Sequence, residues 1–172
     1  HSKKGFSDLL EALAILNRKN DRFAVAVVGK GSDLLTAKAR ELGVVNEFVP
    51  IPELDSTSQG EIGTFPSKEL IELYKCSDYF VLPSYIETYA NVALEAMAAG
   101  TPVVVTDAPG CIDTVVDGED GLIVSVGAPH EIADRIFLLE DDALLREKIV
   151  RKGRIKAQAQ DWDFISQRYL DV

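Results

Sequence analysis

Residues 79–105 read Tyr79-Phe-Val-Leu-Pro-Ser-Tyr-Ile-Glu-Thr-Tyr-Ala-Asn-Val-Ala-Leu-Glu-Ala-Met-Ala-Ala-Gly-Thr-Pro-Val-Val-Val105. The first four residues form a β-rich apolar run that closes at Pro-Ser, and a helical pattern follows from Asn91 to Ala99. Gly-Thr-Pro ends this helix, and three valines begin the next apolar run. The stretch therefore predicts a strand, a loop, a short helix and a second strand.

The same alternation of strands and helices continues on both sides of this stretch. Apolar β-rich runs predict strands at 23–28, 46–51, 79–82, 103–105 and 122–124. Helical spacing predicts helices at 6–17, 33–42, 67–76, 91–99, 129–139, 143–158 and 164–170, and polar residues 52–66 predict a loop. We expect Ser32 or Asp33 to cap the second helix and Ser67 to cap the third.

The predicted strands are short, almost entirely apolar and not alternating, as in a parallel sheet that is covered on both faces. The sequence therefore predicts the α/β class with a doubly wound parallel sheet. In such folds, ligands bind beyond the carboxyl ends of the strands. The loops after Val28, Ile51, Leu82, Val105 and Val124 are consequently the candidate binding loops.

Composition excludes several classes of function. The chain has 172 residues, which fits one domain spanning 1–172, and its formal net charge of -10 argues against a general nucleic-acid-binding surface. His1 and His130 are far apart, so we expect no dedicated transition-metal site. Cys76 and Cys111 lie among apolar residues and are predicted to be buried free thiols in a reducing, cytoplasmic setting. No apolar stretch approaches the ~20 residues of a membrane-spanning helix.

The predicted loop and helix at 83–99 carry groups suited to phosphate and sugar recognition. Amides of residues 88–92 lie at or near the open first turn of the helix, where the helix dipole favours a diphosphate. Glu87 lies in the loop, and Glu95, one turn deeper, can accept two hydrogen bonds from a vicinal diol such as a ribose. Taken alone, a glutamate on a helix such as Glu95 is usually a solvated surface residue, and Lys4 is more typical of a solvated charge near a helix start.

The whole segment resembles the signature of the large retaining glycosyltransferase family called group 1 or family 4, whose fold is the two-Rossmann-domain GT-B type. That signature begins with a Pro-Ser pair at a strand end, followed by a Glu. A second Glu comes after seven further residues and leads directly into Ala-Met-Ala-Ala-Gly-x-Pro-Val-Val. Glu87 and Glu95 have this spacing in the present chain. Further matching stretches are Lys3–Leu10, Val27–Gly31, Leu73–Asp78, Pro109–Val124 and Trp162–Tyr169. The resemblance covers nearly the full length.

The resemblance implies a role for each matching residue. Glu95 would hold the ribose hydroxyls, Glu87 would contact hydroxyls of the donor sugar, and Lys4 would neutralise the departing diphosphate. Lys4 and Glu87 are thus the implied catalytic residues. The implied donor-binding residues are Gly29, Gly31, Thr88, Tyr89, Ala90, Asn91 and Glu95. The implied donor is a UDP-, GDP- or ADP-sugar, and neither a metal nor another cofactor is expected.

The chain departs from the family pattern in three ways. It begins after the family's Gly-Arg pair, and it has Glu87-Thr-Tyr-Ala90 where Glu-Gly-Phe-Gly is common, which restricts the loop. The resemblance also implies an N-terminal acceptor domain, which these 172 residues do not include. We therefore expect the chain alone to bind the donor without completing transfer to a glycan, lipid or other hydroxyl acceptor. We expect residues 161–172 to form a helix able to pack on the missing domain, and any contact with the inner membrane face to come through that missing half.

Two alternatives remain at this point. Gly29-Lys-Gly-Ser-Asp-Leu34 begins like the Gly-x-Gly-x-x-Gly fingerprint of dinucleotide-binding dehydrogenases, although Leu34 replaces the third glycine. The acidic residue that the fingerprint requires could be Glu53. The second alternative is a non-catalytic sugar-nucleotide-binding module with the same fold, because fold does not fix function.

Overall fold

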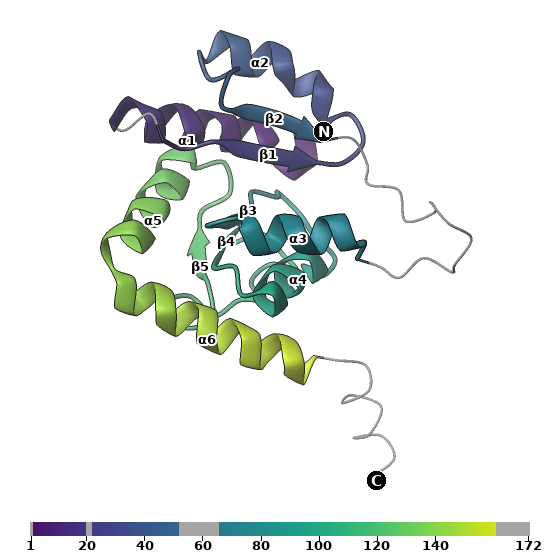
Figure 1. The fold of residues 1–172 in the computed structure, drawn as a ribbon, viewed down its shortest axis with the longest axis vertical. Coiled ribbons are helices and arrows are strands. Elements are labelled where there is room, and N and C mark those ends of the chain that lie inside the picture. The colour runs from purple at the N-terminus through teal and green to yellow at the C-terminus, as the bar shows by residue number, and fades with distance from the viewer. Residues whose placement is uncertain (1, 20–21, 52–65, 161–172) are drawn as a thin grey trace, which may run out of the picture.

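The computed structural model describes residues 2–19, 22–51 and 66–160, and strands and helices alternate along them (Figure 1). The elements are η1 Ser2–Lys4, α1 Phe6–Lys19, β1 Val25–Val28, η2 Ser32–Leu35, α2 Thr36–Glu41, β2 Phe48–Ile51, α3 Lys68–Cys76, β3 Phe80–Leu82, α4 Asn91–Ala99, β4 Val103–Thr106, β5 Leu122–Val124, α5 Pro129–Asp141 and α6 Ala143–Ala159. The predicted α/β class is confirmed. The predicted helix at 164–170 and all but the last residue of the predicted loop at 52–66 lie outside the described residues.

Every strand pair in the described part of the chain is parallel, as predicted. β1 pairs with β2, with Val25 opposite Phe48. β4 lies between β3 and β5, with Val103 opposite Phe80 and Val105 opposite Ile123. Hydrogen bonding thus divides the described strands between a sheet of β1 and β2 and a sheet of β3, β4 and β5. In each sheet, the parallel strands bring their carboxyl ends to one edge.

Helices cover both faces of the β3–β4–β5 sheet, which explains why its strands are apolar throughout. One core cluster joins α3 and α4 to β3 and β4 through residues such as Tyr74, Met97 and Val105. A second cluster, with Leu16 and Ile132, joins α1, α5 and α6 to β4 and β5. A third cluster packs α1 and α2 around β1 and β2, so α1 contributes to two clusters and links the two sheets.

Helix α4 has the predicted bounds because its C-terminal signal is strong. Gly100 takes φ 89° in the left-handed region at the C-cap, a conformation that favours glycine. Gly153 then allows α6 to cross α4 closely, because a Cβ at that position would lie 3.1 Å from Met97 Cγ. These two glycines end α4 and hold α6 against it.

Two expectations about small side chains are wrong. Ser32 does not cap a helix: its hydroxyl donates to the carbonyl of Ile51 at 3.0 Å, and α2 begins only after the 3₁₀ turn η2, with no side-chain cap from Ser32 or Asp33. Cys76 is exposed at the end of α3, where the helix turns its side chain away from the core, whereas Cys111 is buried as expected. The Ser67 cap is confirmed, since its hydroxyl accepts from the Leu70 amide at 3.3 Å.

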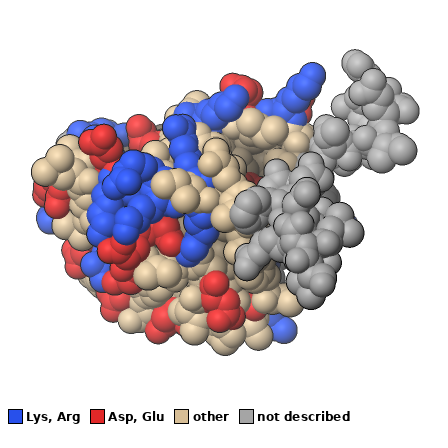
Figure 2. Space-filling model, turned by 90° about the horizontal axis from the view of Figure 1, so that it is seen from below, with Lys and Arg blue, Asp and Glu red and all other residues tan. Residues whose placement is uncertain are grey.

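Helix α6 carries a row of lysines that is neutralised by acidic residues of the neighbouring turn. Lys148 and Lys152 both pair with Glu119, and Lys156 pairs with Asp120 at 2.6 Å. Figure 2, which views this end of the molecule, shows basic and acidic side chains interleaved. No helix in the described part of the chain combines the length and apolarity needed to cross a lipid bilayer.

Candidate functional site

The N-terminal turn packs against the carboxyl end of β3. The Tyr85 amide donates to the Lys3 carbonyl at 2.9 Å. Gly5 takes φ 64°, and a Cβ there would lie 1.8 Å from the carbonyl oxygen of Pro83. Only glycine permits this close approach, which brings Lys4 beside the loop that follows β3.

Lys4 and Glu87 form an ion pair in this site. Lys4 Nζ lies 2.7 Å from Glu87 Oε1, and the Ser84 hydroxyl donates to the same oxygen at 2.7 Å. The Glu87 side chain is 15% exposed and that of Lys4 is 52% exposed, so the carboxylate is held inside and the ammonium faces outward. Glu87 Oε2 has no hydrogen-bond partner among the described residues. The two residues that the resemblance implies to be catalytic are therefore in direct contact.

The loop after β4 supports the Glu87 loop from the other side. The Glu87 amide donates to the Pro109 carbonyl at 3.1 Å. Gly110 takes φ 82°, and a Cβ there would lie 2.4 Å from the Glu87 carbonyl oxygen. Glu87 is thus fixed by its backbone as well as by its carboxylate.

The N-terminus of α4 leaves some of its amides open. Thr88, Tyr89 and Val92 have N–H groups without a partner among the described residues, and α4 has no side-chain N-cap. We expected the Ala90 amide to be open, but it donates to Thr114 Oγ1 at 3.4 Å. The Asn91 amide is also occupied, because it donates to the Tyr89 carbonyl at 3.0 Å. Ala90 is buried and Asn91 is exposed. The open amides and the helix dipole still favour an anion at this end of α4.

Glu95 lies one turn into α4 and contacts a residue that the sequence did not single out. Its Oε2 accepts a hydrogen bond from the Tyr74 hydroxyl of α3 at 3.1 Å. Burial raises the pKa of the Glu95 carboxyl above its usual value, and the Tyr74 hydrogen bond offsets part of that rise. Burial also raises the pKa of Tyr74, so its hydroxyl stays protonated and donates. Glu95 is a half-buried group with a fixed partner and not a solvated surface carboxylate.

The glycine turn after β1 lies at the carboxyl edge of the other sheet. Gly29 takes φ 134° with no atom within 4 Å of a Cβ built on it, and Gly31 takes φ 79°. The turn leads into the short 3₁₀ element η2. A dinucleotide fingerprint needs an α-helix N-terminus at this point, so the local structure does not favour the dehydrogenase alternative.

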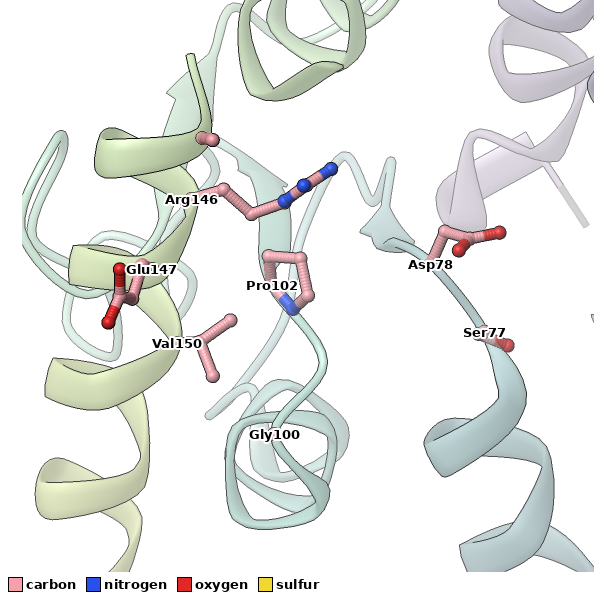
Figure 3. A pocket seen from close by; sticks show the side chains of 8 residues that line it. Ser77, Asp78, Gly100, Pro102, Arg146, Glu147 and Val150 are labelled. Carbon is pink, nitrogen blue, oxygen red and sulfur yellow. The ribbon is translucent and has the colours of Figure 1, made fainter. Parts of the chain in front are cut away.

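A shallow, open hollow lies at the opposite edge of the sheet. It encloses about 560 Å³ between the end of α3, the end of α4 and the start of α6, and is lined by Asp78, Pro102 and Arg146 among others (Figure 3). Asp78 and Pro102 lie just before β3 and β4, whereas ligands of doubly wound folds bind where the strands end. We therefore place the candidate site at Lys4, Glu87 and the start of α4. Among the described residues, no cluster of three or more His, Cys, Asp or Glu side chains could hold a metal ion.

Comparison with known proteins agrees with the fold class and the family predicted from the sequence. The family described as glycosyl transferases group 1 matches residues 1–156. The chain is 32% identical over 172 residues to an uncharacterized glycosyltransferase of Methanocaldococcus jannaschii, a match that covers 99% of this chain and 41% of that protein. The chain thus spans less than half the length of this relative.

Solved structures give the same result. The C-terminal domain of a glycosyl transferase group 1 family protein from Francisella tularensis matches with a TM-score of 0.74 and 26% identity, over 93% of this chain and 80% of that chain. HepE from Anabaena, solved in complex with UDP-glucose, matches in fold with a TM-score of 0.83 and 22% identity, over 99% of this chain and 45% of that chain. Since the family match extends over most of its residues, the chain belongs to the glycosyl transferases group 1, a family of transferases.

Proposed function

We propose that this chain binds a nucleoside-diphosphate sugar and serves as the donor-binding domain of a retaining glycosyltransferase. The observation that carries the proposal is the meeting of Lys4, Glu87 and the open start of α4 at the carboxyl end of β3. A cation and oriented amides suit a diphosphate, and a neighbouring carboxylate suits sugar hydroxyls. The solved UDP-glucose complex of a protein with the same fold supports this class of ligand.

Each group has a proposed role. The amides of Thr88 and Tyr89 bind the diphosphate, with Ala90 and Asn91 shaping the same turn, and Lys4 neutralises the leaving oxygens. Glu87 Oε2 accepts from hydroxyls of the donor sugar. Glu95 accepts from the ribose diol, and the open space beside Gly29, in the turn that also contains Gly31, admits the nucleotide.

The chemistry requires fixed positive potential and no strong nucleophile from this domain. Breaking the anomeric C–O bond builds positive charge on the sugar and negative charge on the diphosphate. Preorganised donors aimed at the developing negative charge are worth about 3–4 kcal/mol each in comparable sites. Because Lys4 is paired with Glu87 before the donor arrives, the diphosphate must draw the ammonium partly away from that carboxylate. We propose that a domain outside this chain binds the acceptor, a glycan, lipid or other hydroxyl compound.

Thermal shift and calorimetry with UDP-, GDP- and ADP-sugars test this function. A ligand that binds the folded state raises the melting temperature. We expect one nucleotide class to do so, with no response to NAD, and we expect EDTA to leave the affinity unchanged because the proposal includes no metal. Absence of a shift with all three classes would overturn the proposal. Binding of a donor by a full-length protein that never transfers its sugar would favour a non-catalytic module.

A further inference from the structure

Tyr74 contacts the candidate ribose-binding carboxylate from a neighbouring helix. Its hydroxyl donates to Glu95 Oε2 at 3.1 Å, and the two residues lie 21 positions apart. Tyr74 is 7% exposed and belongs to the core cluster between α3, α4 and the sheet. The hydroxyl is the polar end of a side chain whose ring is otherwise packed among apolar groups.

Both the backbone and the ring of Tyr74 are fixed. The Thr101 hydroxyl, just after α4, donates to the Tyr74 carbonyl at 2.6 Å. The Tyr74 ring meets the edge of Phe80 in β3 with centroids 5.6 Å apart and planes at 72°. The ring therefore has little freedom to rotate, and its hydroxyl is aimed at one place.

A neutral donor is well suited to orienting a carboxylate that must bind a ligand. A carboxylate has about four acceptor positions, and Tyr74 takes one of them on Oε2. Glu95 Oε1 has no partner among the described residues. A lysine or arginine in place of Tyr74 would cancel the negative charge, whereas a phenol fixes the orientation and leaves the charge in place.

We propose that Tyr74 is a positioning residue that holds the Glu95 carboxylate in the orientation required to grip the two ribose hydroxyls of the donor. This inference rests on the proposed function. It adds one residue, Tyr74 of α3, to the proposed site. That helix lies outside the strand-end loops and the glycine turn already described.

The test compares Tyr74→Phe with a matched control, Tyr79→Phe. Tyr79 also donates its hydroxyl to a glutamate, Glu140 of α5, and is itself partly buried. Both variants thus lose one tyrosine–glutamate hydrogen bond, and only the first loses the bond to Glu95. Calorimetry would use the nucleoside diphosphate that the wild-type chain binds, together with its 2′,3′-dideoxy analogue.

We expect Tyr74→Phe to weaken binding of the ribonucleotide by roughly 10–150-fold, the range for one hydrogen bond to a charged group, and to leave the affinity for the dideoxy analogue unchanged. Tyr79→Phe should change neither affinity. Added to Glu95→Gln, the Tyr74→Phe change should have no further effect, because its role passes through Glu95.

The outcomes separate this inference from the proposed function. If the wild-type chain binds no nucleotide, both the proposed function and the positioning role of Tyr74 are overturned. If it binds and Tyr74→Phe weakens both ligands equally, or neither, the positioning role alone is overturned. If Tyr74→Phe fails to fold, crystals of the unaltered chain with the nucleotide decide the matter. Tyr74 should stay within hydrogen-bond distance of Glu95 while the ribose occupies the remaining carboxylate positions, and a Glu95 turned away from Tyr74 would refute the proposal.

Discussion

Lys4 and Glu87 lie 83 residues apart in the sequence, yet Lys4 Nζ and Glu87 Oε1 are 2.7 Å apart in the folded chain. The pair balances two opposite charges at the end of β3 before any ligand is present. Under the proposed function, a diphosphate would compete with the carboxylate for the ammonium, and a sugar hydroxyl would replace the lysine at Glu87. The unliganded site is thus arranged for an exchange of partners.

Lys4→Ala should slow sugar transfer in the full-length enzyme. Removing one preorganised group that stabilises the leaving charge typically lowers turnover by about 10²–10³-fold. Lys38→Ala is the control, because Lys38 also pairs with glutamates, Glu11 and Glu41, on helices away from the site. Steady-state kinetics would measure both variants, and an unaltered rate for Lys4→Ala would remove Lys4 from the mechanism.

Gly110→Ala should displace the Glu87 loop. The new Cβ would lie 2.4 Å from the Glu87 carbonyl oxygen, in addition to the strain of φ 82°. Gly118→Ala is the control, since Gly118 also has a positive φ, 69°, but has nothing within 4 Å of the added Cβ. We expect both variants to lose about 1 kcal/mol from the backbone strain. Only Gly110→Ala should also lose donor affinity, and calorimetry showing equal affinities would contradict the supporting role of Gly110.

Glu95→Gln should stabilise the fold while weakening nucleotide binding. Burial raises the pKa of Glu95 in the folded chain, so the folded state favours the protonated form. Stability is therefore lost as pH rises through the raised pKa, and at neutral pH the ionised carboxylate is destabilising. Thermal unfolding should show a higher melting temperature for the variant at about pH 7.5 and little difference below the usual carboxyl pKa of 4.5. A variant that melts lower at both pH values would contradict this prediction.

Glu119 should contribute to stability above acidic pH. Hydrogen bonds from Lys148 and then Lys152 lower the pKa of Glu119 from 4.5 to about 2. A lowered pKa adds stability above the unfolded value, and this stability is lost as pH falls from 4.5 toward 2. Glu119→Gln should flatten this part of the pH profile. Because the pairs are exposed, salt at about 1 M should reduce the difference, and a profile that keeps its slope in the variant would contradict this assignment.

Much of the fold was predictable because local signals were strong. The bounds of α4 were predicted at Asn91 and Ala99, since a helical pattern ends at a glycine that takes a left-handed conformation. The Ser67 cap was predicted from a serine that directly precedes a helical pattern. The parallel strands were predicted from runs of continuous apolar residues. These features depend on a few neighbouring residues.

Contacts between distant elements were less predictable. The sequence alone favoured a solvated Lys4, and only the family resemblance predicted that it belongs to the site. Tyr74 and Thr114 were missed because their roles depend on how α3 and the loop after β4 pack against α4. Ser32 was misassigned for the same reason, since its hydroxyl found the carbonyl of Ile51, 19 residues away. A short side chain with a hydroxyl group has several potential hydrogen-bond partners, and packing selects among them.

The fit of Gly5 under Pro83 has a consequence for making hybrid enzymes. Because the turn that carries Lys4 is seated on the backbone at the end of β3, the two segments form a single interlocking unit although they are far apart in the chain. If this domain were exchanged between relatives with a crossover inside α1, Lys4 and the loop after β3 that it contacts would come from different parents. A crossover placed ahead of residue 3 keeps both segments from one parent.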